Sequence, residues 1–179
     1  MATSLPKISL TPVQLAYHVT DPREAAADHA SKLGWGPFFV MEDIPLEYAR
    51  HRSEARKFRH SSAYGQAGRM MVEFIAQLDD EPSALRDMFT RNETGLHHIA
   101  CFVDDLAGAK LAFAQNGFAM ALDAKTRTGV EFVMVDTRHT LGHMLELYEP
   151  SAQLVNFYDF VANKATGWDG ERPVRMLRV

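Results

Sequence analysis

Hydrophobic and polar positions repeat in two long stretches of the chain, residues 14–35 and residues 98–118, and both stretches predict the same elements. Each stretch begins with a polar residue and continues with a short apolar strand that ends in Val19 or Val103. An aspartate suited to a helix N-cap, an alanine-rich helical segment and a closing glycine follow in the same order in both. The repeat therefore predicts a strand, a turn, a helix and a second turn in each half.

Three further strands are predicted after each helix. In the first half they are PFFVMED, KFRHSSAYG and GRMMVEFIAQL, and the polar insertion PLEYARHRSEAR separates the first two. In the second half they are FAMALDAK, GVEFVMVDT and GHMLELYEP, bounded by glycine, proline and polar clusters. We therefore expect an α+β fold of two tandem βαβββ modules, which form a curved mixed sheet around a cleft with the helices on the outer face.

This pattern divides the chain into one domain and a tail. We expect the domain to span residues 12–150, with the first module over about 12–80 and the second over about 95–150. The insertion at 44–60 is expected to be a solvated hairpin or loop, with a substrate-gating flap as the alternative. The tail, residues 151–179, begins with a helix-compatible apolar pattern and is rich in aromatic residues. It is expected to pack over the sheet or against a second subunit, and a homodimer is the expected assembly.

Alternation along a strand assigns its side chains to two faces of the sheet. In the second module, His97 and Cys101 fall on the apolar side that meets the helices, where we expect them to pack. Gln14 and His98, which occupy equivalent positions in the two modules, then face the opposite, concave side.

The last strand of each module carries a glutamate among apolar residues, Glu73 within MVEF and Glu146 within MLEL. Alternation turns both glutamates toward the concave side that Gln14 and His98 face. An ionised carboxylate buried without a partner costs several kcal/mol, and a divalent cation would neutralise two of them. One amide oxygen, two carboxylates and one imidazole suit Zn, Mn, Ni, Co or Fe(II) and leave coordination positions for substrate or water. These four residues are therefore the predicted metal ligands.

Composition narrows the classes of partner. With 179 residues, 46% of them hydrophobic, the chain can bury the core of an ordinary domain. A formal net charge of −4 and scattered basic residues do not give the basic surface that nucleic acid or an anionic membrane requires, so small molecules or proteins are the expected partners, and a small-molecule substrate is predicted. Cys101 is the single cysteine, and the N-terminal MATSLPKISL has too short an apolar run for a signal peptide, which favours the cytoplasm.

Within the tandem pattern, GLHHIACFVDD opens the second module and GHMLELYEP ends it, and both resemble the vicinal oxygen chelate superfamily. This superfamily includes glyoxalase I, methylmalonyl-CoA epimerase, extradiol dioxygenases and fosfomycin-resistance enzymes. The resemblance covers roughly residues 12–150 and implies metal positions on the first and last strand of each module. The order of Gln14, Glu73, His98 and Glu146 is similar to that of glyoxalase I, so the glyoxalase and epimerase group is the nearest one.

This resemblance implies a metal-dependent isomerase or lyase that promotes proton transfer next to a carbonyl through a metal-bound enediolate. It implies that Glu146 is the general base and that Glu73 is its partner on the opposite face of the substrate. Glyoxalase I holds glutathione with two arginines, and His18 and Thr94 stand at those positions here.

A glutathione substrate is therefore disfavoured, and the predicted concave face favours a bulky, apolar carbonyl compound or an acyl-CoA. Three residues are expected to line the substrate site: His18, Phe102 and Tyr148. His18 has a structural hydrogen bond as its alternative role, and His60 lies on a predicted strand from which it can reach the cleft.

Two other functions stay open. Extradiol dioxygenases use two histidines and one glutamate as ligands, so Gln14 counts against ring cleavage but leaves it as an alternative. The second alternative is a metal-free protein that binds or sequesters a small molecule, similar to the bleomycin-sequestering members of the same fold.

Overall fold

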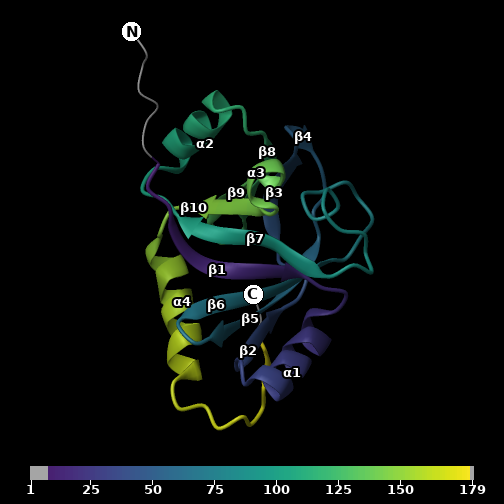
Figure 1. The fold of residues 1–179 in the computed structure, drawn as a ribbon, viewed down its shortest axis with the longest axis vertical. Helices are drawn as coiled ribbons and strands as arrows, with labels where there is room; N and C mark the ends of the chain where they lie inside the picture. The colour runs from purple at the N-terminus through teal and green to yellow at the C-terminus, as the bar shows by residue number, and fades with distance from the viewer. Residues whose placement is uncertain (1–7, 178–179) are drawn as a thin grey trace.

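One curved, unclosed sheet of 11 strands forms the centre of the computed structural model, which describes residues 8–177. Its strand order is β11-β2-β5-β6-β1-β7-β10-β9-β8-β3-β4 (Figure 1). The predicted α+β fold of two βαβββ modules is confirmed. Most of the predicted N-terminal segment, residues 1–7, and the last two residues of the predicted tail, 178–179, lie outside the described residues.

Each module supplies four neighbouring strands and one long helix. The first consists of β1 (Thr11–His18), α1 (Pro22–Leu33), β2 (Phe38–Met41), β5 (His60–Ala67) and β6 (Met70–Gln77). The second consists of β7 (Gly95–Phe102), α2 (Leu106–Gln115), β8 (Met120–Thr126), β9 (Glu131–Val135), the short α3 (Arg138–Leu141) and β10 (Met144–Tyr148). The antiparallel pair β1 and β7 joins the modules at the middle of the sheet (Figure 1).

The predicted aspartate caps begin both long helices. Asp21 accepts hydrogen bonds from the backbone N–H groups of Arg23 and Glu24, and Asp105 accepts one from Gly108. These bonds satisfy N–H groups that have no partner within the first turn of a helix. Gly34 ends α1 in the left-handed conformation, with a φ of 67° that glycine adopts at little cost.

Strand pairing within the two modules follows one register. In each module the first strand runs parallel to the last, β1 beside β6 and β7 beside β10. The equivalent pairs are Gln14 with Met71 and Ala16 with Glu73 in the first module, and His98 with Met144 and Ala100 with Glu146 in the second. The internal repeat of the sequence is therefore a repeat of backbone geometry around the middle of the sheet.

Alternating residues of the last strands separate the two faces, as the period of two predicts. Val72 and Phe74 pack with α1, whereas Leu145 and Leu147 pack with α2 and with Cys101. The intervening residues of these strands face the other side of the sheet, where a second apolar cluster surrounds the predicted site.

The insertion and the tail extend the sheet at opposite ends. The insertion forms the hairpin β3 (Leu46–His51) and β4 (Glu54–Ala55), and β3 pairs with β8 of the second module. The tail forms α4 (Ala152–Ala165) and β11 (Val174–Met176), and β11 pairs with β2 of the first module. Among residues 8–177, no helix combines the length and apolarity needed to span a bilayer.

Candidate metal centre and substrate pocket

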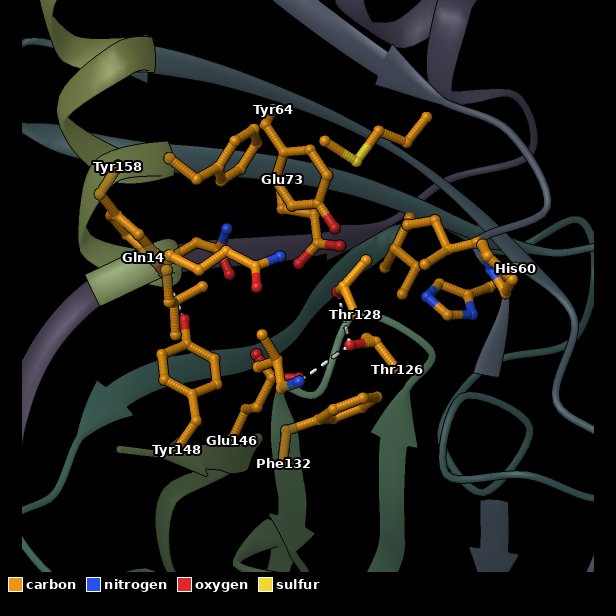
Figure 2. A pocket seen from close by; sticks show the side chains of 18 of the residues that line it. Gln14, His60, Tyr64, Glu73, Thr126, Thr128, Phe132, Glu146, Tyr148 and Tyr158 are labelled. Atoms are coloured by element: carbon orange, nitrogen blue, oxygen red, sulfur yellow. Dashed lines mark hydrogen bonds between the residues drawn. The ribbon is translucent and has the colours of Figure 1, made fainter. Parts of the chain in front are cut away.

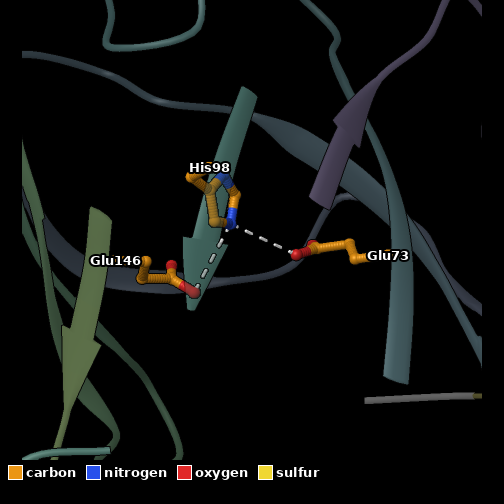
Figure 3. Close-up of side chains that lie close together, drawn as sticks. All are labelled: Glu73, His98 and Glu146. Carbon is orange, nitrogen blue, oxygen red and sulfur yellow. Dashed lines mark ion pairs between the residues drawn. The ribbon is translucent and has the colours of Figure 1, made fainter. Parts of the chain in front are cut away.

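Three of the four predicted ligands converge at the middle of the concave face (Figure 3). His98 Nε2 lies 3.6 Å from Glu73 Oε2 and 3.5 Å from Glu146 Oε2. The ligand atoms of the three residues all lie within 4.8 Å of one another. His98, Glu73 and Glu146 are 0%, 4% and 8% exposed, so two carboxylates and an imidazole share a buried space.

This geometry fits a divalent cation. Two protein atoms that each lie about 2.0–2.2 Å from one ion are at most about 4.4 Å apart. Both separations measured from His98 Nε2 fall within that limit and exceed the usual length of a hydrogen bond. Nε2 is also buried without a hydrogen-bond partner in the described part of the chain, which is uncommon for a buried polar atom. An ion held between these three residues would use that atom.

Gln14 lines the same pocket, from the row of cross-strand neighbours that also carries Glu146 (Figure 2). It pairs with Ala100 on β7, and Ala100 pairs with Glu146 on β10, so Gln14 and Glu146 lie two strands apart in one row. Its amide nitrogen donates to the Sδ of Met71 at 3.2 Å, which leaves the amide oxygen available as a ligand.

A β-bulge precedes the ligand residue in each of the two central strands. In β7, His97 is the extra residue between the pairs Leu96–Tyr17 and His98–Ala16. In β1, Val13 is the extra residue on the way from Pro12 to Gln14. Bulges redirect side chains and are frequent beside functional sites. Here both bulges fall at the same position of the internal repeat.

The bulge gives His97 a role that sequence alternation missed. Its Nδ1 lies 2.9 Å from His98 Nδ1, and its Nε2 lies 2.9 Å from the carbonyl oxygen of Ala84. The expectation that His97 packs beside the helices is therefore wrong, because the extra residue rotates the ring toward its neighbour.

The contact between the rings fixes which nitrogen of His98 is free. A carbonyl only accepts, so His97 Nε2 donates to Ala84, and a neutral His97 then accepts at Nδ1 from the Nδ1–H of His98. When an ion displaces the second proton of His98, the nitrogen that becomes free is therefore Nε2, which faces the carboxylates. This arrangement matches the outer contact by which metal-binding histidines are oriented.

The electrostatic environment separates the two glutamates. Burial alone would lower the pKa of His98, but Glu146 and Glu73 outweigh it and raise this pKa to about 9. Burial opposes ionisation of Glu73, yet the interaction with the neighbouring His98 outweighs it and lowers the pKa of that carboxyl. For Glu146 burial prevails and, together with the charge of Glu73, raises its pKa. Glu146 is therefore the more basic of the two carboxylates.

A pocket of about 440 Å³ opens onto this centre (Figure 2). Gln14, Glu73 and Glu146 lie at its inner end, and aromatic and aliphatic side chains form most of the remaining wall. Of the three residues expected to line the substrate site, Tyr148 lines this pocket, with its hydroxyl bonded to that of Tyr158. Phe102 lies behind both tyrosines, with its ring centre 5.4 Å from each of theirs.

His18 is placed elsewhere. Its Nδ1 lies 2.7 Å from the carbonyl oxygen of Glu93, and its Nε2 lies 3.2 Å from a guanidinium nitrogen of Arg86. The ring stacks on Phe89 and lines a different cavity. These partners come from the segment between β6 and β7. Of its two expected roles, the structure supports the structural hydrogen bond.

Two further polar residues line the pocket from β5. His60 reaches it, as its strand position allowed, and stacks on Phe58 at 4.5 Å between ring centres. Burial lowers the pKa of His60, so its ring is neutral. Tyr64 lies directly opposite Glu73 in the β5–β6 pair, and burial followed by the charge of Glu73 raises its phenol pKa. The cross-strand position of Tyr64 was the sequence signal that could have identified it.

Comparison with protein families gives one match. The sequence profile described as Glyoxalase/Bleomycin resistance protein/Dioxygenase superfamily matches residues 13–134. The matched segment contains Gln14, Glu73 and His98 and ends before Glu146, which β10 brings to the site. No curated protein matches the chain.

Solved structures with the same fold include the hypothetical protein BH1468 from Bacillus halodurans C-125, with a TM-score of 0.58, 17% identity, and coverage of 81% of this chain and 97% of that one. Methylmalonyl-CoA epimerase from Mycobacterium tuberculosis has a TM-score of 0.51 and 18% identity over 87% of this chain and 96% of its own. A Streptomyces coelicolor methylmalonyl-CoA epimerase variant in complex with 2-nitronate-propionyl-CoA has a TM-score of 0.54 and 15% identity, and the match covers 80% and 97% of the two chains. At these identities the likeness establishes the shared fold.

Proposed function

Because this chain belongs to the Glyoxalase/Bleomycin resistance protein/Dioxygenase superfamily, we propose that it is a metal-dependent isomerase or lyase that moves a proton next to a substrate carbonyl. The observation that carries this proposal is the convergence of Glu73, His98 and Glu146 around one buried space. The methylmalonyl-CoA epimerases among the similar structures support the reaction class.

Three residues would hold the ion: Glu73, His98 and Glu146, with Gln14 as the fourth ligand. Their mixed oxygen and nitrogen donors suit Zn, Mn, Ni, Co or Fe(II). When bound, such an ion polarises a substrate carbonyl and makes the adjacent C–H more acidic. His97 keeps the ring of His98 oriented, and the apolar wall of the pocket excludes water from the reacting group.

Within this proposal Glu146 takes the proton from the substrate carbon and can return it there, and Glu73 is its partner for proton transfer on the opposite face of the substrate. Its raised pKa gives Glu146 greater affinity for a proton than Glu73. General acid and base catalysis of this kind typically contributes a factor of about 10²–10⁴ to the rate. Loss of the Glu146 carboxylate is therefore expected to affect turnover more than metal binding.

The decisive experiment combines metal analysis with hydrogen exchange. Protein purified without chelator is expected to contain about one divalent ion per chain, and NMR in D₂O follows exchange at the carbon next to the carbonyl of 2-hydroxy ketones and acyl-CoA esters. Glu146→Gln is expected to keep its ion and lose exchange by about 100-fold or more, whereas the exposed Glu131→Gln behaves as wild type. Undiminished exchange in Glu146→Gln would refute the assigned base. Iron-dependent oxygen uptake with catechols would favour ring cleavage instead, and metal-free protein with intact ligand binding would favour a sequestering protein.

The proposal includes a homodimer in the cytoplasm. A single, buried cysteine is in keeping with a reducing compartment. Analytical ultracentrifugation and cell fractionation test these two points independently of the chemistry.

A further inference from the structure

We propose that the substrate is an uncharged carbonyl compound with a bulky, apolar body, and that α4 selects it. The inference rests on the proposed function for the reacting end of the substrate. It goes further by distinguishing this ligand from an acyl-CoA and from any other anion.

The charge of the pocket disfavours an anionic ligand. Glu73 and Glu146 are its only acidic residues, and no lysine or arginine lines it in the part of the chain that the structure describes. His60, the remaining titratable base on the wall, is neutral because burial lowers its pKa. A carboxylate or phosphate lodged against the apolar wall, away from an ion at Glu73 and Glu146, would be desolvated without a side-chain cation to pair with.

The nearest group of cations lies outside the pocket, in a neighbouring surface hollow that shares Phe58 with it. Four cations line this hollow: Arg56, Lys57, Arg59 and Arg127. Arg56 already forms an ion pair with Glu54 at 2.6 Å, and Arg59 forms one with Asp43 at 2.8 Å. All four side chains are exposed, where attraction to a phosphate is weakened by water and salt.

The dimensions and chemistry of the wall fit a bulky apolar body. A volume of about 440 Å³ falls within the range of about 300–1,000 Å³ that is usual for pockets of drug-sized ligands. On the sheet side, Phe58, Ile75 and Phe132 contribute apolar surface. Neutral groups, including the hydroxyls of Thr126 and Thr128, supply the hydrogen bonding (Figure 2).

The opposite wall comes from α4. Leu154, Phe157, Tyr158 and Phe160 line the pocket from this helix. The helix begins after the last strand of the second module, beyond the family match at residues 13–134. A segment outside the family match therefore forms much of the surface that meets the body of the substrate.

The packing of α4 makes this wall a fixed part of the structure. Val161 is 0% exposed beneath the helix. The rings of Phe157 and Tyr64 meet edge to face with 5.1 Å between their centres, and the ring centres of Phe160 and Phe39 lie 4.7 Å apart. Rigid aromatic surface of this kind discriminates ligands by shape with little loss of conformational entropy on binding.

The test compares two probes on the full-length protein, with and without Mn²⁺: 2-hydroxy-1-tetralone, which is neutral and has two fused rings, and methylmalonyl-CoA. Equilibrium dialysis measures binding, and NMR in D₂O measures exchange next to each carbonyl. We expect the tetralone to bind at least about tenfold more tightly. Tighter binding of methylmalonyl-CoA would overturn the substrate class. If the tetralone binds but does not exchange its proton, the proposed function is refuted and the substrate class stands. If only the CoA ester exchanges, the proposed function stands and the substrate class is refuted.

The contribution of α4 is tested with Phe157→Ala and, in parallel, Leu154→Ala. Each is expected to weaken tetralone binding by about tenfold, because each removes apolar contact area from the wall. Asp159→Ala, at an exposed position of the same helix, is expected to bind as wild type. Thermal unfolding identifies a variant that does not fold. If one of the two wall variants fails to fold, tetralone binding by the other tests the role of α4. Wild-type binding in the folded wall variants would overturn the role of α4.

Discussion

The two modules place equivalent residues at the same point of the sheet but support them differently. In the first module, Gln14 contacts the sulfur of Met71. In the second, His98 is oriented by His97, which is itself held by the carbonyl of Ala84. Equal backbone register therefore supplies the positions, and the surrounding side chains determine how strong each ligand is. The second module is the one built to present a basic nitrogen with a defined proton arrangement.

The largest expected effect comes from deleting the ligand of each module in turn. His98→Ala is expected to lower metal affinity by about 100-fold or more, because it removes the central donor that lies near both carboxylates. Gln14→Ala is expected to lower it by only about tenfold, since a neutral amide oxygen is a weaker donor. Competition with a chromophoric chelator measures both affinities. Equal losses of metal affinity in the two variants would show that the two modules contribute equally to metal binding, which would contradict the inferred difference between them.

The next largest effect tests the contact by which His97 orients His98 in the second module. His97→Phe keeps an aromatic ring but removes the nitrogen that accepts from His98, and is expected to lower metal affinity by about 10–100-fold. Val13→Ala changes the equivalent bulge residue of the first module and is expected to leave metal affinity nearly unchanged. The same chelator titration applies. An unaltered affinity in folded His97→Phe would refute the orienting role.

A smaller expected effect concerns the free energy of unfolding and tests whether the two central strands are packed equally tightly. Ala16 and Ala100 are 0% exposed and lie on the two central strands, where they pair with Glu73 and Glu146 of the neighbouring strands. Adding two methyl groups to either is expected to lower the free energy of unfolding by about 1–3 kcal/mol, because both positions are closely packed. Urea unfolding of Ala16→Val and Ala100→Val should give similar losses, with the exposed Ala55→Val as control. A large loss for one variant only would show that the modules differ in packing as well as in chemistry.

The smallest effect concerns the ion pairs that attach the inserted hairpin to the second module. Hydrogen bonds from Arg138, and then from Arg52 of the hairpin turn, overcome the opposing effect of burial and hold the pKa of Asp136 well below its usual range. A depressed carboxyl pKa adds stability above its unfolded value of about 3.9, and this stability is lost as the pH falls through the folded value.

Asp136→Asn is therefore expected to cost about 1 kcal/mol at pH 7, with a difference from wild type that shrinks below about pH 4. Urea unfolding across this pH range measures the difference. A constant difference down to pH 2 would contradict the assignment.

Local periodicity was sufficient to predict the faces of the strands and the placement of the glutamates. Glu73 and Glu146 stand at the same step of two equivalent strands, so an alternation of two residues brings both to one side. The capping aspartates Asp21 and Asp105 likewise act within one helical turn. Such features depend on neighbours a few residues away, which the sequence displays directly.

The features that sequence could not supply depend on long-range register and coverage. The bulge at His97 exists only relative to its partner strand β1, and a single sequence does not show which residue is left unpaired. The position of His18 outside the pocket is accompanied by contacts with Arg86 and Phe89, which come from an irregular segment. In the same way, α4 offered an apolar pattern without revealing which surface it would cover.

The two ends of the sheet have a consequence for assembly. The sheet terminates in β4, of two residues, and in β11, of three. Strands this short expose few unpaired backbone groups, so another chain would gain little by adding a strand at either end. The insertion and the tail thus limit the addition of further strands at the two ends of the sheet.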